Sequence, residues 1–335
     1  MTSREISRIR MYFQGLSHRA FETPADMVRY FGAVQAQDFL GSLWAVGQRV
    51  ENATEASVEA ALNNGSIIRS WPMRGTIHYT APEDLRWMLD LLGERAIAKS
   101  VTYQADVGLK KKDFAKSRAI IEKEMQGGKI LERNEVYELL ERNRIATKNT
   151  RGLHIIGQMA REKVICFGPR RGKQPTFVLL DEWAPKTRAL SKDEALAELT
   201  LRYFTSHGPA TARDFAWWAG ITLTDAGRGL DMVNWNLKKI GDYWMNSDDF
   251  ELRKGQTISL LPAYDEFLVA YKEREDMQII FRSTIILNGE VVGTWKRSIR
   301  KEGVKIETKL TKKVSGAALE RQLKRYADFI GYIPL

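Results

Sequence analysis

Five tetrads of the form Ser/Thr-x-x-acid between residues 23 and 225 divide this part of the chain into short helical segments. In such a tetrad the hydroxyl caps the backbone N–H three residues later and the acidic side chain caps the first residue in return, so the tetrad marks the start of a helix. Apolar residues at helical spacing follow each tetrad, which predicts that short helices dominate the first 240 residues. The tetrads occupy residues 23–26, 80–83, 191–194, 211–214 and 222–225.

Short β-hairpins are predicted between these helices. In each, two β-prone segments flank a turn rich in Gly, Pro and Arg. Helices followed by a hairpin are the order of elements in a winged helix, and this order occurs at least twice. The predicted strand pairs are 67–71 with 76–80, and 163–167 with 176–180.

A third unit is predicted over residues 191–241. Gly208-Pro209 ends a first helix, Gly220 ends a short second helix, and Thr222 begins a third. This succession is typical of a helix-turn-helix, although many helical proteins contain such a trio without binding DNA.

Strands become frequent after residue 257. Asn288-Gly289 between two apolar runs predicts a β-hairpin, and a last helix is expected over 315–329. The fold class is therefore mainly α with short β-hairpins, with tandem winged-helix motifs and a C-terminal α+β, β-rich domain. The predicted strands are 257–261, 277–287, 290–296 and 304–310, and the predicted domains are 1–100, 101–190, 191–250 and 251–335.

The chain is basic, with 52 Lys and Arg against 42 Asp and Glu, a formal charge of +10. Residues 277–335 hold 12 of these cations and 5 of the carboxylates, 12 − 5 = +7. Such a segment suits a polyanion such as nucleic acid, and the alternative is a solvated basic face without a partner.

Several classes of protein are excluded. Cys166 is the one cysteine, so no intramolecular disulfide forms, and the four histidines lack the spacing of a zinc motif. No apolar run reaches the roughly 18 residues of a membrane span, and the charged N-terminus lacks the apolar stretch of a signal peptide. We expect a cytoplasmic protein that uses no metal and no cofactor.

The segment 168–173 resembles a phosphate-binding loop only superficially. Three residues separate its glycines, where a P-loop has four, and Gln174 follows the lysine. As the tip of a hairpin with Arg170, Arg171 and Lys173, it is better explained as a contact to phosphate or to a DNA groove.

Gln35 and Gln37 are separated by one apolar residue. They point the same way only where the backbone is extended, since in a helix they would lie roughly 200° apart. A convergent pair of amides could surround one water with carbonyl acceptors and N–H donors, and the alternative is polar residues at a helix end. Asp265 and Glu266 form a second candidate acidic site, but adjacent carboxylates in an extended segment face opposite sides, which disfavours a paired acid–base role.

Four segments of the chain together resemble the winged-helix DNA glycosylases of the AlkZ/YcaQ type. The most specific is the string Arg-x-Trp-Pro-x-Arg-Gly-Thr-x-His of residues 69–78, and the order of the segments matches over essentially the whole chain. The resemblance implies tandem winged helices, excision of alkylated bases and unhooking of interstrand crosslinks. The other three segments are 35–37, 261–266 and 289–297.

The same resemblance implies that Gln35 and Gln37 are catalytic, because the motif of one family branch is Gln-apolar-Gln. Hydrolysis of an N-glycosidic bond passes through an oxocarbenium-like sugar. An N7-alkylguanine already carries positive charge and leaves without protonation, so two amides that position water could suffice. We expect Gln37 to hold the water and Gln35 to orient the water or the sugar.

The partner we expect is double-stranded DNA containing alkylated purines, bound by a monomer. A transcription regulator without catalysis is the alternative, but no long heptad helix supplies the dimer interface that regulators use. A nucleic-acid chaperone or repair scaffold is a third possibility. His78 has two open roles, as a DNA contact or as a buried organiser of its hairpin. The candidate DNA-binding residues are Arg69, Trp71, Arg74, His78, Arg170, Arg171, Lys173, Lys296 and Arg297.

Overall fold

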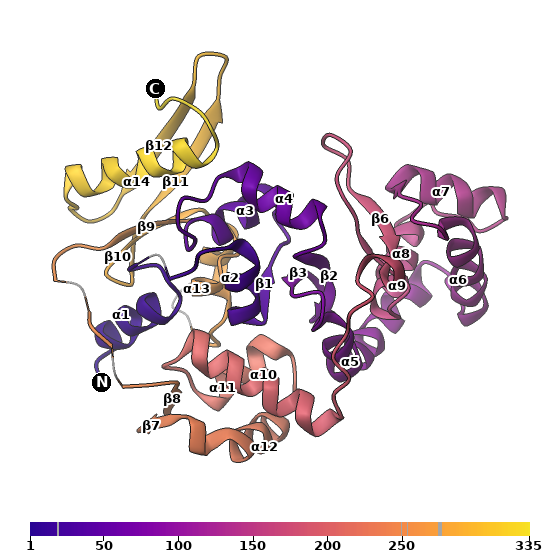
Figure 1. The fold of residues 1–335 in the computed structure, drawn as a ribbon, viewed down its shortest axis with the longest axis horizontal. Helices are drawn as coiled ribbons and strands as arrows, with labels where there is room; N and C mark the ends of the chain where they lie inside the picture. Colours follow the sequence, from indigo (N-terminus) through magenta and orange to yellow (C-terminus); the bar gives the residue numbers. More distant parts are fainter. Residues whose placement is uncertain (19, 249, 253, 274–276) are drawn as a thin grey trace. The chain divides into compact units, whose positions relative to one another are not determined.

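The computed structural model describes residues 1–18, 20–248, 250–252, 254–273 and 277–335. The chain forms two compact units (Figure 1). Unit 1 comprises residues 1–60 and 196–335, and unit 2 comprises residues 61–195. The divisions fall inside two helices, α4 (Glu55–Asn63) and α10 (Lys192–His207).

The N-terminal part of unit 1 alternates short helices with one short strand. Thr23 caps α2 by accepting from the Asp26 N–H, and Pro24 occupies the first helical position, as its tetrad predicts. Gly32, at φ +77°, ends α2 and lets the chain turn directly into β1. The elements are α1 (Ser3–Phe13), α2 (Pro24–Phe31), β1 (Ala33–Gln35) and α3 (Phe39–Gly47).

The predicted helix trio is present in unit 1. Thr211 and Thr222 each form a complete capping box, and Gly220 ends the middle helix in the left-handed conformation. A short hairpin follows the trio, so the elements have the order of a winged helix. After α10 they are α11 (Ala212–Ala219), α12 (Leu223–Val233), β7 (Lys238–Ile240) and β8 (Tyr243–Met245).

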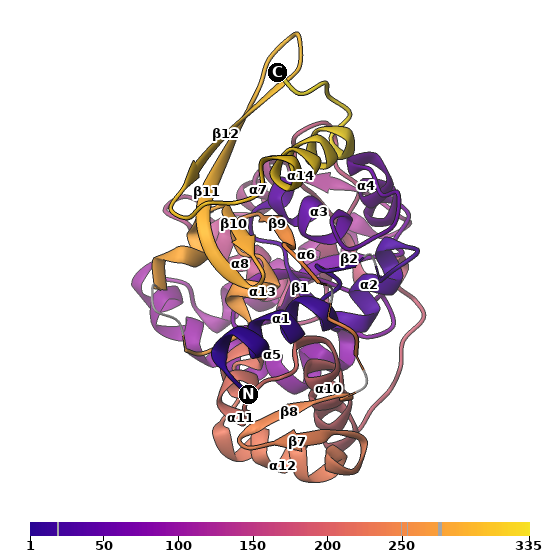
Figure 2. The same cartoon turned by 90° about the vertical axis from the view of Figure 1, so that its left-hand side faces the viewer.

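The C-terminal part of unit 1 is an antiparallel sheet in the order β12-β11-β10-β9, flanked by α14 (Figure 2). Asn288 and Gly289 both have positive φ and form the predicted hairpin turn. The prediction of a strand from residue 277 is wrong, because residues 277–281 form a 3₁₀ helix and pairing begins only at Thr284. The elements are β9 (Ile258–Leu261), α13 (Glu266–Val269), η2 (Met277–Phe281), β10 (Thr284–Leu287), β11 (Glu290–Ile299), β12 (Val304–Leu310) and α14 (Gly316–Phe329).

Unit 2 contains both predicted hairpins, with its strands in the order β3-β2-β5-β6-β4. The prediction that Thr80 caps a helix is wrong: Thr80 pairs with Ile68 in the sheet, and α5 begins at Leu85. The elements are β2 (Ile68–Met73), β3 (Thr76–Thr80), α5 (Leu85–Asp106), α6 (Lys111–Met125), β4 (Leu131–Glu132), α7 (Arg133–Arg142), α8 (Arg151–Arg161), β5 (Ile165–Phe167), β6 (Thr176–Leu179) and α9 (Leu180–Trp183).

These elements confirm the fold class of a mainly helical chain with short antiparallel hairpins and a β-rich C-terminal part. The division into four segments at 100, 190 and 250 differs from the two compact units and stays a prediction. Among the helices that the structure describes, none combines the length and apolarity needed to cross a membrane.

Candidate active site

The Gln35-Ala36-Gln37 segment lies between two helices of unit 1. The backbone is extended through Gln35, and α3 begins only at Phe39, so the pair does not have helical spacing. Gln35 is buried, with 8% of its surface exposed, whereas Gln37 is exposed. The backbone is thus extended up to Gln35, and Gln37 lies in the bend before α3.

Three N–H donors converge on the buried carboxylate of Glu266. The backbone N–H of Gln35 donates to Oε1 over 2.6 Å. Oε2 accepts from Nε1 of Trp218 at 2.9 Å and from Nε2 of His207 at 3.3 Å. Because an ionised carboxylate only accepts, this arrangement suits the charged form of Glu266. It also ties the backbone of a candidate catalytic residue to α13.

The neighbouring carboxylate, Asp265, has different partners. It accepts two hydrogen bonds from the Arg49 guanidinium, at 2.7 and 2.9 Å, and one from Nε2 of Gln48 at 3.1 Å. Asp265 also caps α13 by accepting from the Phe267 N–H. The two adjacent acids therefore diverge and do not form an acid–base pair, although they lie at the start of α13 and not in the extended segment assumed from the sequence.

His207 lies within an aromatic enclosure next to Glu266. Its ring stacks on Tyr203, with centroids 4.9 Å apart and planes 11° apart, and meets Phe31 edge-on at 5.2 Å. Burial lowers the pKa of His207, and the hydrogen bond to Glu266 opposes part of that effect. The ring thus packs as an apolar surface while its Nε2 supports Glu266.

The motif segments of unit 1 meet around β9. Nε1 of Trp44, on α3, donates to the Leu260 carbonyl at 2.6 Å, and Nε1 of Trp295, on β11, donates to the Leu261 carbonyl at 2.9 Å. A Cβ on Gly41 would lie 3.1 Å from Cβ of Pro262, so α3 packs closely on the residues after β9. Segments distant in the sequence thus pack together around β9.

The β2–β3 hairpin of unit 2 carries Arg74 and His78. Arg74 and Gly75 have φ values of +53° and +76°, the conformation of a two-residue type I′ turn. Nδ1 of His78 lies 2.9 Å from the Thr76 carbonyl oxygen, and Nε2 lies 3.3 Å from Nη2 of Arg74. Since the carbonyl only accepts and the guanidinium only donates, these contacts suit the tautomer with its hydrogen on Nδ1. It is fully buried, which favours its role as organiser of the hairpin.

Arg69 and Trp71 contact the same ring, as expected of residues on one face of a strand. Trp71 stacks on Phe167 with centroids 4.7 Å apart, and the Arg69 guanidinium lies 4.4 Å from the Phe167 centroid. Trp71 is 8% exposed and belongs to a core cluster of unit 2. Its observed contacts are therefore those of a packing residue, and DNA contact stays a prediction.

The candidate phosphate-binding cations differ in how they are held. Arg171 is fixed by Glu135 at 3.1 Å and by the Ile130 carbonyl at 2.9 Å. Lys173 is exposed at the tip of the β5–β6 hairpin, where its carbonyl accepts from Arg170. On β11, Lys296 is exposed, while Arg297 donates to the Tyr326 hydroxyl of α14.

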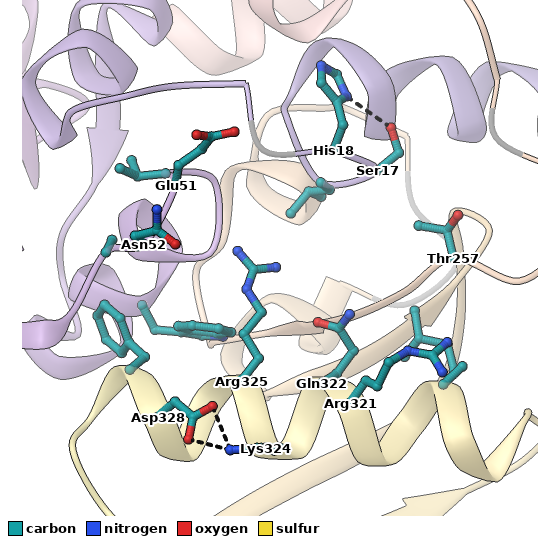
Figure 3. A pocket seen from close by; sticks show the side chains of 18 of the residues that line it. Ser17, His18, Glu51, Asn52, Thr257, Arg321, Gln322, Lys324, Arg325 and Asp328 are labelled. Carbon is teal, nitrogen blue, oxygen red and sulfur yellow. Dashed lines mark hydrogen bonds and ion pairs between the residues drawn. The ribbon is translucent and has the colours of Figure 1, made fainter.

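A cavity of about 960 Å³ lies in unit 1 beside α14, at the C-terminal end of α3 (Figure 3). Gln37 precedes the opposite end of α3, about 13 Å away at 1.5 Å per residue. Lys324 pairs with Asp328 at 3.0 Å, and Arg325 donates to the Gln48 carbonyl. The Arg325 bond ties α14 to the residue after α3, and we assign the cavity no part in the reaction. Its charged lining residues are Lys254, Arg321, Lys324, Arg325, Glu51 and Asp328.

Sequence reasoning missed the group around Gln35. The acidic dipeptide at 265–266 stands out in the sequence, but nothing there links Glu266 to His207, Trp218 or Gln35. No motif or residue spacing in the sequence singles out Arg49. Within the described ranges, no cluster of three or more His, Cys, Asp or Glu residues could hold a metal ion.

Comparisons with known proteins agree with one another. A family model described as DNA glycosylase AlkZ-like matches residues 28–329. An interstrand DNA cross-link repair glycosylase of Streptomyces sahachiroi is 23% identical over 330 residues, covering 88% of this chain and 87% of the relative. The solved structure of Streptomyces sahachiroi DNA glycosylase AlkZ is similar with a TM-score of 0.81 at 19% identity, covering 100% of this chain and 98% of that chain. The structural likeness shows a shared fold.

Proposed function

Because the chain belongs to the AlkZ-like DNA glycosylase family and is an enzyme of that kind, we propose that it hydrolyses the N-glycosidic bond of cationic alkylated purines. The proposed substrates are N7-alkylguanine, N3-alkyladenine and interstrand crosslinks in double-stranded DNA. Gln35 and Gln37 are the proposed catalytic residues. The enzyme is proposed to act as a cytoplasmic monomer and to leave an abasic site intact.

The chemistry of these lesions matches the residues of the Gln-Ala-Gln segment. Cleavage of the N-glycosidic bond develops positive charge on the sugar. A cationic purine leaves without a proton, so the site needs a positioned water and partial negative charge near the sugar more than a strong acid. Amide carbonyls of Gln35 and Gln37 supply both.

The observation that carries this proposal is the anchored backbone at Gln35, the first residue of the Gln-Ala-Gln segment. Gln35 is fixed through its N–H to the buried Glu266, while Gln37, two residues on, is exposed to solvent. One end of the segment is therefore rigid and the other is accessible to a substrate, which is what positioning a water requires.

Binding to DNA is proposed to use the basic hairpins. Arg170 and Lys173 at the β5–β6 tip, and Lys296 on β11, are placed on hairpins of the kind that reach phosphates or grooves. Arg69, Arg74 and Arg297 are proposed secondary contacts. A transcription regulator without catalysis would also bind DNA, but it would not need Gln35 and Gln37 as catalytic residues.

The test is a product assay. The protein is incubated with methylated duplex DNA, and free 7-methylguanine is measured in the supernatant, with unmethylated DNA as the control. Release of 7-methylguanine at catalytic protein concentration supports the proposal. DNA binding without release of any base would favour the regulator.

A further inference from the structure

We propose that Glu266 is a positioning residue of the glycosylase reaction, which holds Gln35 in place from inside unit 1. This inference rests on the proposed catalytic role of the glutamine pair. Glu266 does not touch the substrate in this scheme. It acts through the backbone of Gln35, whose N–H donates to it over 2.6 Å.

The contact is made by a carboxylate that the fold itself holds rigidly. Glu266 is 1% exposed, and its second oxygen is held by Trp218 and His207, which lie on two different helices. The preceding residue, Asp265, is locked to Arg49 by two hydrogen bonds. The Glu266 side chain is therefore held in one position, and it holds the Gln35 backbone N–H in turn.

Burying a carboxylate costs free energy that packing alone would not require. Burying an ionised group costs several kcal/mol before its hydrogen bonds offset the loss. An apolar side chain would fill the same volume without that cost, but it could not accept the Gln35 N–H. The directional bond is thus what the carboxylate adds at this position.

The bond matters because the placement of a reactive water is sensitive to small displacements. A shift of about 1 Å in a positioning group can lower a rate by about a hundredfold. β1 is only three residues long, and Gln37 lies in the bend that follows it. Without the bond to Glu266, this short extended segment loses an anchor one residue away from Ala36 and two away from Gln37.

The test measures single-turnover release of 7-methylguanine at saturating DNA, together with hydrogen exchange of the segment 33–38. Glu266→Ala is expected to lower the rate at least tenfold and to speed exchange in that segment, with DNA affinity within about twofold of the wild type. Glu266→Gln keeps an oxygen that can accept the Gln35 N–H. Its amide nitrogen would then face the Trp218 N–H, so this variant is expected to restore the rate and the protection from exchange only in part.

Gln48→Met is the matched control. Gln48 is also buried and also donates to a buried carboxylate, but to Asp265 instead of Glu266. This variant keeps both Arg49 bonds to Asp265, so it is expected to lose stability without a change in rate or in exchange at 33–38. All variants are compared below their melting temperatures, so that a loss of folded protein does not enter the rate.

The outcomes separate this inference from the proposed function. If Gln35→Ala and Gln37→Ala lose activity while Glu266→Ala keeps the wild-type rate, Glu266 is not a positioning residue. If both glutamine variants retain the full rate, the proposed mechanism itself fails. Unchanged exchange at 33–38 in Glu266→Ala overturns the inference whatever the activity. Should Glu266→Ala not fold, Glu266→Asp, with a shorter reach, is measured against the same two readouts.

Discussion

Arg49 and Asp265 form a two-point ion pair that is closed to solvent on both sides, with N–O distances of 2.7 and 2.9 Å and no exposed side-chain surface. The other Arg49 hydrogen bonds go to the Gln14 carbonyl, the Ala45 carbonyl and Oε1 of Gln14. The five bonds match the five N–H donors of a guanidinium. This pair connects the end of α3 to the residue that precedes Glu266.

Asp265→Asn is expected to lower the free energy of unfolding by about 3–5 kcal/mol, because it leaves Arg49 charged and buried without its counter-ion. Denaturant unfolding of the full chain measures the loss. The double variant Arg49→Met with Asp265→Leu should recover part of the stability, since neither charge is then buried. A loss below about 1 kcal/mol for Asp265→Asn would mean that water or another group replaces the pair.

Gln37→Ala is expected to slow single-turnover excision of 7-methylguanine at least tenfold, about 1.4 kcal/mol or more in barrier. Gln37 is exposed, so the melting temperature and DNA affinity should stay near those of the wild type. Gln126→Ala is the control, because Gln126 is an exposed glutamine at the C-terminal end of α6 in unit 2. Near-normal excision by Gln37→Ala would remove this residue from the mechanism.

Arg170→Ala with Lys173→Ala is expected to weaken binding to all duplex sequences alike. The slope of log affinity against log salt should fall by roughly one unit for each phosphate that the variant no longer binds. Arg118→Ala serves as the control, since Arg118 is an exposed cation of α6 paired with Glu122. An unchanged salt dependence in the double variant would show that the β5–β6 tip does not contact DNA.

Acidification is expected to destabilise the protein partly through His207. Its pKa in the folded state is lowered by burial, with Glu266 opposing the shift. Below an unfolded value of about 6.5, the unfolded chain binds a proton that the folded chain excludes, so stability falls as pH drops from about 7.5 towards the folded pKa. One such proton contributes at most about 1.4 kcal/mol per pH unit.

The measurement compares melting temperatures at about pH 7.5 and about pH 5.5, on either side of the unfolded pKa, for the wild type and for His207→Gln, which no longer titrates. The wild type should lose more stability than the variant over this interval. The pKa of His154 is also lowered by burial, so His154→Gln is carried as a parallel variant. Equal losses in the wild type and His207→Gln would show that His207 is not excluded from protonation.

The enzyme is expected to excise cationic bases and to leave neutral bases in the DNA. Release of uracil or hypoxanthine requires a proton or a strong donor for the leaving base. Near the glutamine pair, the acid adjacent in sequence is Asp38, which is exposed at the start of α3 and makes no capping hydrogen bond with its side chain. Duplexes carrying uracil, hypoxanthine or 7-methylguanine are assayed in parallel. Robust uracil release would show that a proton donor has been overlooked.

Local signals in the sequence predicted local structure well. The capping boxes at Thr211 and Thr222 and the turn at Asn288-Gly289 need only residues within a few positions of one another, and all three are present. At Thr80 the local signal gave a wrong prediction. Its tetrad has the form of a cap, but pairing with Ile68 in the sheet determines its conformation.

The support of the candidate site could not be predicted, because its contacts join residues far apart in the chain. Glu266 lies 231 positions from Gln35, and Asp265 lies 216 positions from Arg49. A buried carboxylate and a surface carboxylate look alike in a sequence, since both are strongly polar. Only the fold shows that one acid of the pair faces Arg49 and the other faces Gln35.

The separation between Arg49 and Asp265 also sets an order of events during protein synthesis. At about 5–20 residues per second, a ribosome needs about 10–40 s to make the residues between them. All of unit 2, residues 61–195, is synthesised within that interval, whereas unit 1 still lacks α13 and its C-terminal sheet. Unit 2 is therefore the first part of the nascent chain that has all its residues, although it begins sixty residues after the N-terminus.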